Sequence, residues 1–199
     1  MNISFTLRRA LILASCSFSL ALVISTAQAQ VTISGLSVIS GPVNTGVVIS
    51  GSGFGGAQGN STVTFNGTLA PTSSWSDSSI NVNVPAGAAT GPVVVNVAGV
   101  SSNSIVFTVT PFIASLSLST GPVQMGFTIT GTSFGAQQGT STVTLGSITL
   151  PAANVISWSD SAIKVSVPAG AATGNVVVST NGQPSNGVDF TVINPFSCN

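Results

Sequence analysis

Apolar and polar residues alternate along short stretches of this chain, and clusters of Gly, Pro, Asn and Ser separate the stretches. Residues 80–84 read Ile-Asn-Val-Asn-Val, and residues 163–167 read Ile-Lys-Val-Ser-Val. Because successive side chains of a β-strand point to opposite faces, these segments are expected to bury Ile and Val and to expose Asn, Lys and Ser. No stretch after residue 29 has the length and the 3.6-residue period of a helix. The chain beyond residue 29 is therefore predicted to be all-β.

The same pattern predicts six strands in the first half of the chain and a matching set in the second half. Four Phe residues occupy equivalent places in the two halves and are expected to fill two cores: Phe54, Phe107, Phe134 and Phe190. The first-half strands are expected near residues 32–39, 47–50, 62–65, 80–84, 93–97 and 105–109, with a further short one near 68–70.

The second half of the chain repeats the first. Residues 33–65 and 113–145 are identical at 17 of 33 positions, and residues 75–110 and 158–193 at 23 of 36. The offsets of 80 and 83 differ by three residues, which fall within 147–157 and therefore lengthen a loop. Copies of about 80 residues suit two β-sandwiches better than a solenoid, whose repeats are about 20–50 residues long.

Very little chain separates the two copies. The last predicted strand of the first copy ends near Val109, and Phe112 already begins the second. Pro111 fixes its own backbone and restrains the residue before it. We therefore predict a fairly rigid end-to-end pair with Phe112 packed at the junction, in domains spanning 30–110 and 111–194 and followed by a tail at 195–199.

Residues 1–29 have the order of a secretory signal peptide: Arg8 and Arg9, an apolar stretch at 10–24, and Ala-Gln-Ala at 27–29. Cleavage between Ala29 and Gln30 would follow, with Ala27 and Ala29 as the small residues of the site. A transmembrane anchor is the alternative, but the apolar stretch is short of the roughly 20 residues needed and contains three Ser residues.

Leu-Ala-Ser-Cys at 13–16 also resembles a bacterial lipobox, which would place a lipid on Cys16; the apolar run that continues past Cys16 argues against it. With the signal removed, Cys198 is the one remaining Cys, so an internal disulfide is excluded. Cys198 is a candidate for an intermolecular disulfide, although its place beside the last residue favours an incidental thiol. The chain would be secreted or attached at the cell surface, with the periplasm as a further possibility.

The composition excludes several classes of function. The chain has three basic and three acidic residues, no His and no Tyr, so groups that titrate near neutral pH for acid–base catalysis are missing. After Arg9 the only basic residue is Lys164, which leaves no basic stripe for nucleic acid. The three Asp residues lie far apart in the sequence, whereas calcium needs six to eight clustered oxygens. We predict no catalytic residues, no cofactor and no metal.

Two motifs that suggest catalysis or a cofactor occur in unsuitable contexts. Gly-Ser-Gly-Phe-Gly-Gly at 51–56 matches a dinucleotide-binding pattern, but a strand is predicted at 62–65 where that site needs a helix. Ser161 and Lys164 have the Ser-x-x-Lys spacing of penicillin-recognising enzymes, but in a strand residues three apart project to opposite faces. A glycine-rich turn and a strand are the better interpretations.

Trp75 and Trp158 are the only Trp residues, and they occupy equivalent positions. Exposed, they would provide a surface on which a sugar stacks. We favour the alternative that each Trp plugs the edge of its own sandwich while Asp77 or Asp160 organises the adjoining turn. Two Asn-x-Ser/Thr sequons, at 60–62 and 66–68, would carry glycans only in a host that glycosylates them.

Several short blocks occur in the same order in both copies. The blocks are Gly-Pro at 41–42 and 121–122, Ile-Ser-Gly-Ser-Gly-Phe-Gly at 49–55, Phe-Gly at 134–135, Trp-Ser-Asp at 75–77 and 158–160, Val-Pro-Ala-Gly at 84–87 and 167–170, and Phe-Thr-Val at 107–109. Together they resemble the IPT/TIG domain. The resemblance implies an immunoglobulin-like β-sandwich, of the kind found in surface receptors, in secreted and adhesive bacterial proteins and beside carbohydrate-active enzymes. It carries no catalytic residues.

The sequence thus favours an exported, non-catalytic protein of two tandem immunoglobulin-like domains that acts in adhesion, scaffolding or another interaction with an unknown protein or polysaccharide. The alternative is a carbohydrate-binding protein that uses Trp75, Trp158 or exposed loop amides. Edge strands of the sandwiches could accept a strand from a partner. Specific function is expected where the copies differ: residues 147–157, Lys164 and the Phe112 junction.

Overall fold

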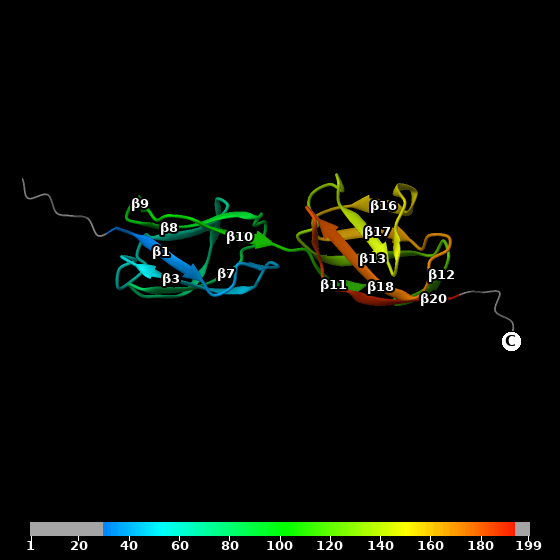
Figure 1. The fold of residues 1–199 in the computed structure, drawn as a ribbon, viewed down its shortest axis with the longest axis horizontal. Helices are drawn as coiled ribbons and strands as arrows, with labels where there is room; N and C mark the ends of the chain where they lie inside the picture. The colour runs from blue at the N-terminus through cyan, green and yellow to red at the C-terminus, as the bar shows by residue number, and fades with distance from the viewer. Residues whose placement is uncertain (1–29, 194–199) are drawn as a thin grey trace, which may run out of the picture.

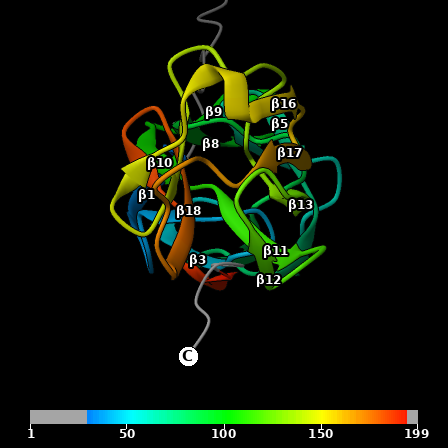
Figure 2. The same ribbon diagram turned by 90° about the vertical axis from the view of Figure 1, so that its right-hand side faces the viewer.

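The computed structural model of the protein describes residues 30–193. The predictions for Cys16, Ala27, Ala29 and Cys198 lie outside this range. The described chain forms two β-sandwiches that stand end to end along one axis (Figure 1). A view along that axis places the second sandwich in front of the first (Figure 2). The predicted all-β class and the tandem arrangement are confirmed.

The first domain packs two sheets around one core. One sheet has the order β1-β3-β7-β6; the other has the order β2-β10-β8-β4-β5, with β9 beside β8. Only β2 pairs in parallel, with β10. The strands are β1 (Thr32–Leu36), β2 (Ser40–Gly41), β3 (Gly46–Ser52), β4 (Thr62–Phe65), β5 (Thr68–Ala70), β6 (Thr72–Trp75), β7 (Ser79–Asn83), β8 (Gly91–Val97), β9 (Val100–Ser101) and β10 (Ile105–Val109).

The second domain repeats this topology, with sheets β11-β13-β17-β16 and β12-β20-β18-β14-β15 and with β19 beside β18. Its elements are β11 (Phe112–Leu116), β12 (Thr120–Pro122), β13 (Gly126–Thr132), β14 (Thr142–Leu145), β15 (Ile148–Thr149), the 3₁₀ turn η1 (Ala152–Asn154), β16 (Val155–Trp158), β17 (Ala162–Ser166), β18 (Gly174–Thr180), β19 (Gln183–Pro184) and β20 (Val188–Ile193). Within residues 30–193 no helix has the length and apolarity needed to cross a bilayer.

The predicted strands all form, but the sequence pattern missed three short ones in each domain. β2 and β9 are two residues long, and β6 reads Thr-Ser-Ser-Trp, which lacks an apolar alternation. The single strand expected over 32–39 ends at Leu36, and the chain then crosses to the other sheet as β2. The extra loop of the second copy is not fully irregular, because residues Ala152–Asn154 form one 3₁₀ turn.

Both cores are centred on the predicted Phe residues. Phe54, Phe107, Phe134 and Phe190 are each at most 1% exposed. Alternation along β7 and β17 is also confirmed, since Ile80 and Ile163 are fully buried while Lys164 is exposed.

Both cores contain a pair of Phe rings in contact, but one member of the pair comes from a different strand in the second domain. In the first domain Phe65 meets Phe107 edge-on, with ring centroids 5.3 Å apart. Leu145 replaces Phe65 in the second copy, and Phe127 on β13 stacks on Phe190 at 4.6 Å instead. One aromatic ring has been lost from one sheet and gained on the other. Such paired changes hold the total volume of a core nearly constant, which is what packing tolerates best.

An Asn side chain joins the two sheets in each domain. Asn103 Oδ1 accepts the Ile33 N–H at 2.8 Å, and Asn103 Nδ2 donates to the Ile33 carbonyl at 2.9 Å. Asn186 makes the same pair of bonds to Ile113. The amide therefore acts like one residue of a neighbouring strand, and it satisfies a buried backbone N–H and C=O together. The sequence suggests a turn at Asn-Gly 186–187; instead Asn186 bridges the sheets.

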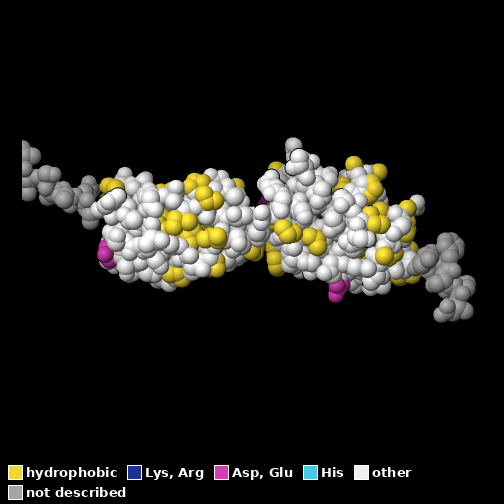
Figure 3. All heavy atoms as spheres, in the orientation of Figure 1, with side chains coloured by type: hydrophobic (Ala, Val, Ile, Leu, Met, Phe, Trp, Pro, Cys, Tyr) yellow, Lys and Arg dark blue, Asp and Glu magenta, His cyan; other side chains and the backbone are white. Residues whose placement is uncertain are grey.

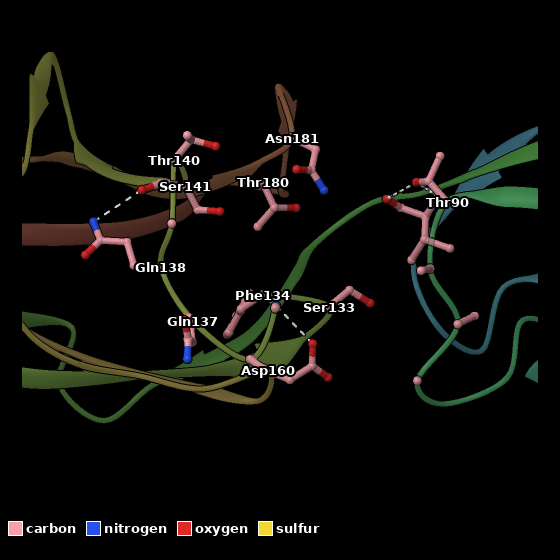
Figure 4. A pocket seen from close by; sticks show the side chains of 17 residues that line it. Thr90, Ser133, Phe134, Gln137, Gln138, Thr140, Ser141, Asp160, Thr180 and Asn181 are labelled. Carbon is pink, nitrogen blue, oxygen red and sulfur yellow. Dashed lines mark hydrogen bonds between the residues drawn. The ribbon is translucent and has the colours of Figure 1, made fainter. Parts of the chain in front are cut away.

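The repeated Val-Pro-Ala-Gly-Ala-Ala-Thr-Gly segment forms the turn between β7 and β8 and between β17 and β18. The Ala88 N–H donates to the Pro85 carbonyl at 3.1 Å, and Gly87 has a φ of 77°. The positive φ at the third position suits Gly and is the geometry of a type II turn. In the first copy this turn lies at the end of the sandwich that faces the second domain (Figure 4).

The connection between the domains is two residues long, Thr110 and Pro111. Pro111 is buried at the junction. The expectation that Phe112 packs there is wrong, since its side chain is 40% exposed. Phe112 begins β11, where alternate residues face outward, and the next residue, Ile113, takes the buried position. The short connection and the buried Pro111 still restrict movement of one domain against the other.

Candidate functional site at the domain junction

The two Trp side chains are fixed in their own domains. Trp75 ends β6, is half-buried against the first core, and donates its indole N–H to the Phe54 carbonyl at 2.9 Å. Trp158 makes the same bond to the Phe134 carbonyl at 3.0 Å. The indole N–H is therefore already satisfied by the backbone. Each Trp is still partly exposed, which leaves part of its surface open to a ligand. Stacking of a sugar on either Trp stays a prediction.

In each domain the glycine-rich segment and one aspartate form a single structural unit. Asp77 accepts the Gly55 N–H on Oδ1 at 3.0 Å, and Asp160 accepts the Gly135 N–H in the same way at 3.0 Å. A Cβ added at Gly51 would clash with the Thr32 carbonyl oxygen. The glycine pattern thus serves a close approach of two backbones, and the carboxylates organise the turn that follows.

Ser161 and Lys164 do not form a catalytic pair. Lys164 lies within β17 with its side chain exposed, while Ser161 is in the turn before that strand. Among residues 30–193 no group of three or more Cys, Asp, Glu or His side chains could hold a metal ion together. The loop 147–157 turns back onto its own sheet, where Asn154 Nδ2 donates to Ser166 Oγ at 3.0 Å.

The edge strands are poorly suited to accept a partner strand. Both edges of the four-stranded sheet carry register shifts, in β1 between Ile33 and Gly35 and in β6 between Thr72 and Ser74. The second domain repeats both shifts. In the other sheet the edges are the short strands β2 and β5. Bulges and short edges are the usual protection against edge-to-edge pairing. Strand addition, suggested by the sequence, is disfavoured.

A cavity of about 490 Å³ lies between the two domains. The first domain contributes the turn 87–90 and Val109, and the second contributes 133–141, Asp160, Thr180 and Asn181. Figure 4 shows Thr180 and Asn181 on one side of it, Ser133 and Asp160 on another, and Thr90 across from them. We call this space the junction cavity. Its volume falls within the range of about 300–1,000 Å³ that small-molecule sites occupy.

Two neighbouring hydroxyl groups are buried without a partner, and one of them belongs to Ser133, which lines the junction cavity. Thr132 Oγ1 and Ser133 Oγ are shielded from solvent and make no hydrogen bond within the described chain. Ser133 also has a φ of 61°, which is the left-handed region that non-glycine residues avoid. An unpaired buried hydroxyl and a left-handed non-glycine residue are each unfavourable for folding. Their coincidence at one place calls for a physical reason.

The rest of the visible surface is nearly free of charge. Figure 3 shows isolated carboxylates on a surface of polar uncharged atoms with scattered apolar side chains. The exposed apolar side chains of the first domain include Val38, Ile39 and Val106, of which Ile39 is 65% exposed. Asp189 takes the place of Val106 in the second copy, so this apolar group is not repeated.

A family model for the IPT/TIG domain matches the chain twice, at residues 31–109 and 111–192. The chain belongs to the IPT/TIG domain family. The two matches agree with the two sandwiches, and the resemblance inferred from the motifs is confirmed. A search of curated proteins finds no match.

Solved structures to which this chain is similar include a surface glycan-binding protein from Prevotella bryantii, at 18% identity over 81% of this chain and 40% of that one, with a TM-score of 0.44. A second is the protein SGBP-B from a xyloglucan utilization locus of Bacteroides uniformis, at 19% identity over 81% and 49%, with a TM-score of 0.35. A γ-cyclodextrin glycosyltransferase from Bacillus clarkii matches at 21% identity over 83% and 26%, with a TM-score of 0.37. The chain spans less than half the length of each.

Sequence reasoning missed the junction cavity, although the duplication contains a signal for it. Four lining residues of the second IPT/TIG domain replace small or apolar residues of the first: Ser133 for Gly53, Gln137 for Ala57, Thr180 for Val97 and Asn181 for Ala98. All four changes add hydrogen-bonding groups. Comparing the two copies position by position reveals the set, but the fold is needed to bring 133–137 and 180–181 together.

Proposed function

We propose that this protein is an exported, non-catalytic binding protein that acts at the cell surface or outside the cell, as an adhesive, scaffolding or interaction module of two IPT/TIG domains. The observation that carries the proposal is the stiff end-to-end pair. A two-residue connection with a buried Pro111 holds two polar, nearly uncharged sandwiches in line. A rod of this kind presents its loops at fixed separations, which favours binding to an extended partner.

The residue chemistry supports binding rather than catalysis. Asp77, Asp160 and Asp189 are the acidic residues of the whole chain and Lys164 is the only base after Arg9, so a matched acid and base are lacking. The single carboxylate at the junction cavity, Asp160, already accepts a backbone N–H. Export rests on the signal-peptide pattern of residues 1–29.

The test measures whether the mature chain, residues 30–199, binds the surface of the cells that produce it. Fluorescently labelled protein is titrated onto intact cells and isolated envelopes, and saturable binding is expected. Pretreating the envelopes with protease removes a protein partner, whereas periodate, which cleaves vicinal diols, removes a polysaccharide partner. The absence of saturable binding to untreated envelopes would refute the proposal. Mass spectrometry of the N-terminus checks for a chain that begins at Gln30 rather than at a lipidated Cys16.

A carbohydrate-binding protein is the second candidate, and one observation favours it. The junction cavity is lined by amides and hydroxyls together with one carboxylate, which suits hydroxyl-rich ligands. Loss of envelope binding after periodate but not after protease would select this candidate over a protein partner.

A further inference from the structure

We propose that the junction cavity is a binding site for a short neutral oligosaccharide. This inference rests on the proposed binding function and gives it a location and a ligand class. The site would be formed by both domains together, with its specific groups on the second domain.

The charge of the lining excludes most other ligand classes. No Lys or Arg lines the junction cavity, and Asp160 is its only charged residue, so an anion would meet repulsion without a counter-charge. A cation would find one carboxylate with one oxygen already bonded to the Gly135 N–H. An apolar ligand would leave the polar lining groups unpaired. A neutral polar ligand is the class that remains.

The hydrogen-bonding groups suit a ligand rich in hydroxyls. Asp160 Oδ2 offers an acceptor that makes no bond within the described chain, and the amides of Gln137 and Asn181 offer both donors and acceptors. The hydroxyls of Thr180 and Thr140 also line the space. Each sugar hydroxyl both donates and accepts, so it can pair with such mixed groups from several directions.

Other lining groups are already committed to the fold. Gln138 Nε2 donates to the Ser141 carbonyl at 3.2 Å, and Thr90 Oγ1 accepts the Val109 N–H at 2.9 Å. These two side chains occur in both copies, as Gln58 and Thr173. Among the uncommitted groups, those of Gln137, Thr180 and Asn181 are acquired by the second copy, whereas Asp160 has its counterpart in Asp77. Structure and duplication thus separate the supporting residues from the candidate contacts.

Ser133 supplies the independent sign of a ligand. Its hydroxyl is buried and unpaired beside the junction cavity, and its backbone is left-handed where the first copy has Gly53. Because Ser133 is one of the residues that line the cavity, a ligand hydroxyl bound there could pair with its Oγ. A residue that is unfavourable for folding and faces a cavity is the usual signature of a functional position.

A strand-like peptide fits the site less well. Peptides commonly bind by adding a strand with regularly spaced backbone bonds, or by lying in an apolar groove. Here the polar groups come from three separate loops and one strand end, and the space lies between domains rather than along a sheet edge. No aromatic ring is exposed in the lining, since Phe134 is fully buried, so affinity would come from hydrogen bonds.

The test is an NMR titration of ¹⁵N-labelled mature chain with maltohexaose, cellohexaose, xylohexaose and mannohexaose. We expect saturable shifts at 133–137, 160 and 180–181 and in the facing turn 87–90. A quadruple variant restores the first-copy residues: Ser133→Gly, Gln137→Ala, Thr180→Val and Asn181→Ala. The same fold already accommodates each of these residues, so the variant is expected to fold. It should bind at least about tenfold more weakly, because it removes four side chains that offer hydrogen bonds to the ligand.

The matched control is Lys164→Asn, another return to the first-copy residue, on an exposed strand position outside the cavity. It should leave affinity unchanged. Three results would overturn the inference: no saturable response to any of the four sugars, equal affinity in the quadruple variant, or shifts centred on Trp75 or Trp158 instead. An equal response to a neutral Gly-Ser hexapeptide would also overturn it.

The envelope-binding assay, run in parallel, separates this inference from the proposed function. If the wild type and the quadruple variant bind envelopes equally well and neither binds sugar, the junction cavity fails as a site while the binding function stands. If the wild type binds no envelope component, the proposed function fails.

Discussion

Replacing Ser133 with Gly should stabilise the second domain. The substitution relieves a left-handed backbone, which costs a non-glycine residue about 1–2 kcal/mol. It also removes a buried hydroxyl that has no partner in the described chain, a group whose burial costs about 1–3 kcal/mol. Against this, Gly loses about 0.5–1 kcal/mol more conformational entropy on folding. The net gain is about 1–4.5 kcal/mol, which corresponds to a rise in melting temperature of at least about 4 °C for a domain of this size.

Each domain contains one Trp, which allows the two domains to be followed separately. The mature chain is labelled with 5-fluorotryptophan, and the ¹⁹F signals of Trp75 and Trp158 are recorded through a thermal or urea transition. Ser133→Gly should raise the midpoint of the Trp158 signal and leave that of Trp75 nearly unchanged. The same variant should weaken oligosaccharide binding, so stability and affinity should move in opposite directions.

The matched control is the reverse change in the first copy, Gly53→Ser. A Cβ at Gly53 would lie 2.8 Å from the Gln30 carbonyl oxygen, and the backbone there has a φ of 76°. This variant should lower the midpoint of the Trp75 signal. An unchanged or lowered Trp158 midpoint in Ser133→Gly would refute the claim that Ser133 is held at a cost to folding.

Three further variants test the fold. Asn103→Ala should destabilise the first domain by about 2–4 kcal/mol, measured by urea unfolding, because it leaves the buried N–H and C=O of Ile33 unpaired; Asn103→Asp, which keeps the acceptor, should cost less. Ala98→Asn should stabilise the first domain by about 0.5–1 kcal/mol in the same assay, because Ala98 has a φ of 49° that Asn tolerates better. Trp75→Phe should cost about 1–2 kcal/mol in thermal unfolding, since it removes the indole bond to the Phe54 carbonyl, and a midpoint equal to the wild type would show that this bond contributes nothing.

The fold was largely predictable because its signals are local. Strict alternation in β7 and β17 and the repeated Pro-Ala-Gly turn report directly on nearby residues, and the structure has both. The strands that were missed, such as β6, are held by pairing to a neighbouring strand and have no apolar pattern of their own. The role of Asn186 as a bridge between the sheets could not be predicted for a related reason. Its partner, Ile113, lies 73 residues away, so the sequence around Asn186 contains no trace of the contact.

The junction cavity could not be predicted from either copy alone, because it exists only where one domain meets the other. Each sandwich has equivalent loops at the end where its first strand, β1 or β11, begins. Only in the second domain do these loops face another sandwich, which the short connection of Thr110 and Pro111 holds close. After a duplication the two domains have identical loops, but only the loops of the second domain contact another domain. These loops are the ones whose surroundings have changed. Polar replacements at Ser133, Thr180 and Asn181, on separate segments that converge at this end, are expected if the new space acquired a ligand. Neutral substitution would not be expected to favour hydrogen-bonding side chains at these positions. It would be expected least of all to favour a Ser with a left-handed backbone and an unpaired hydroxyl.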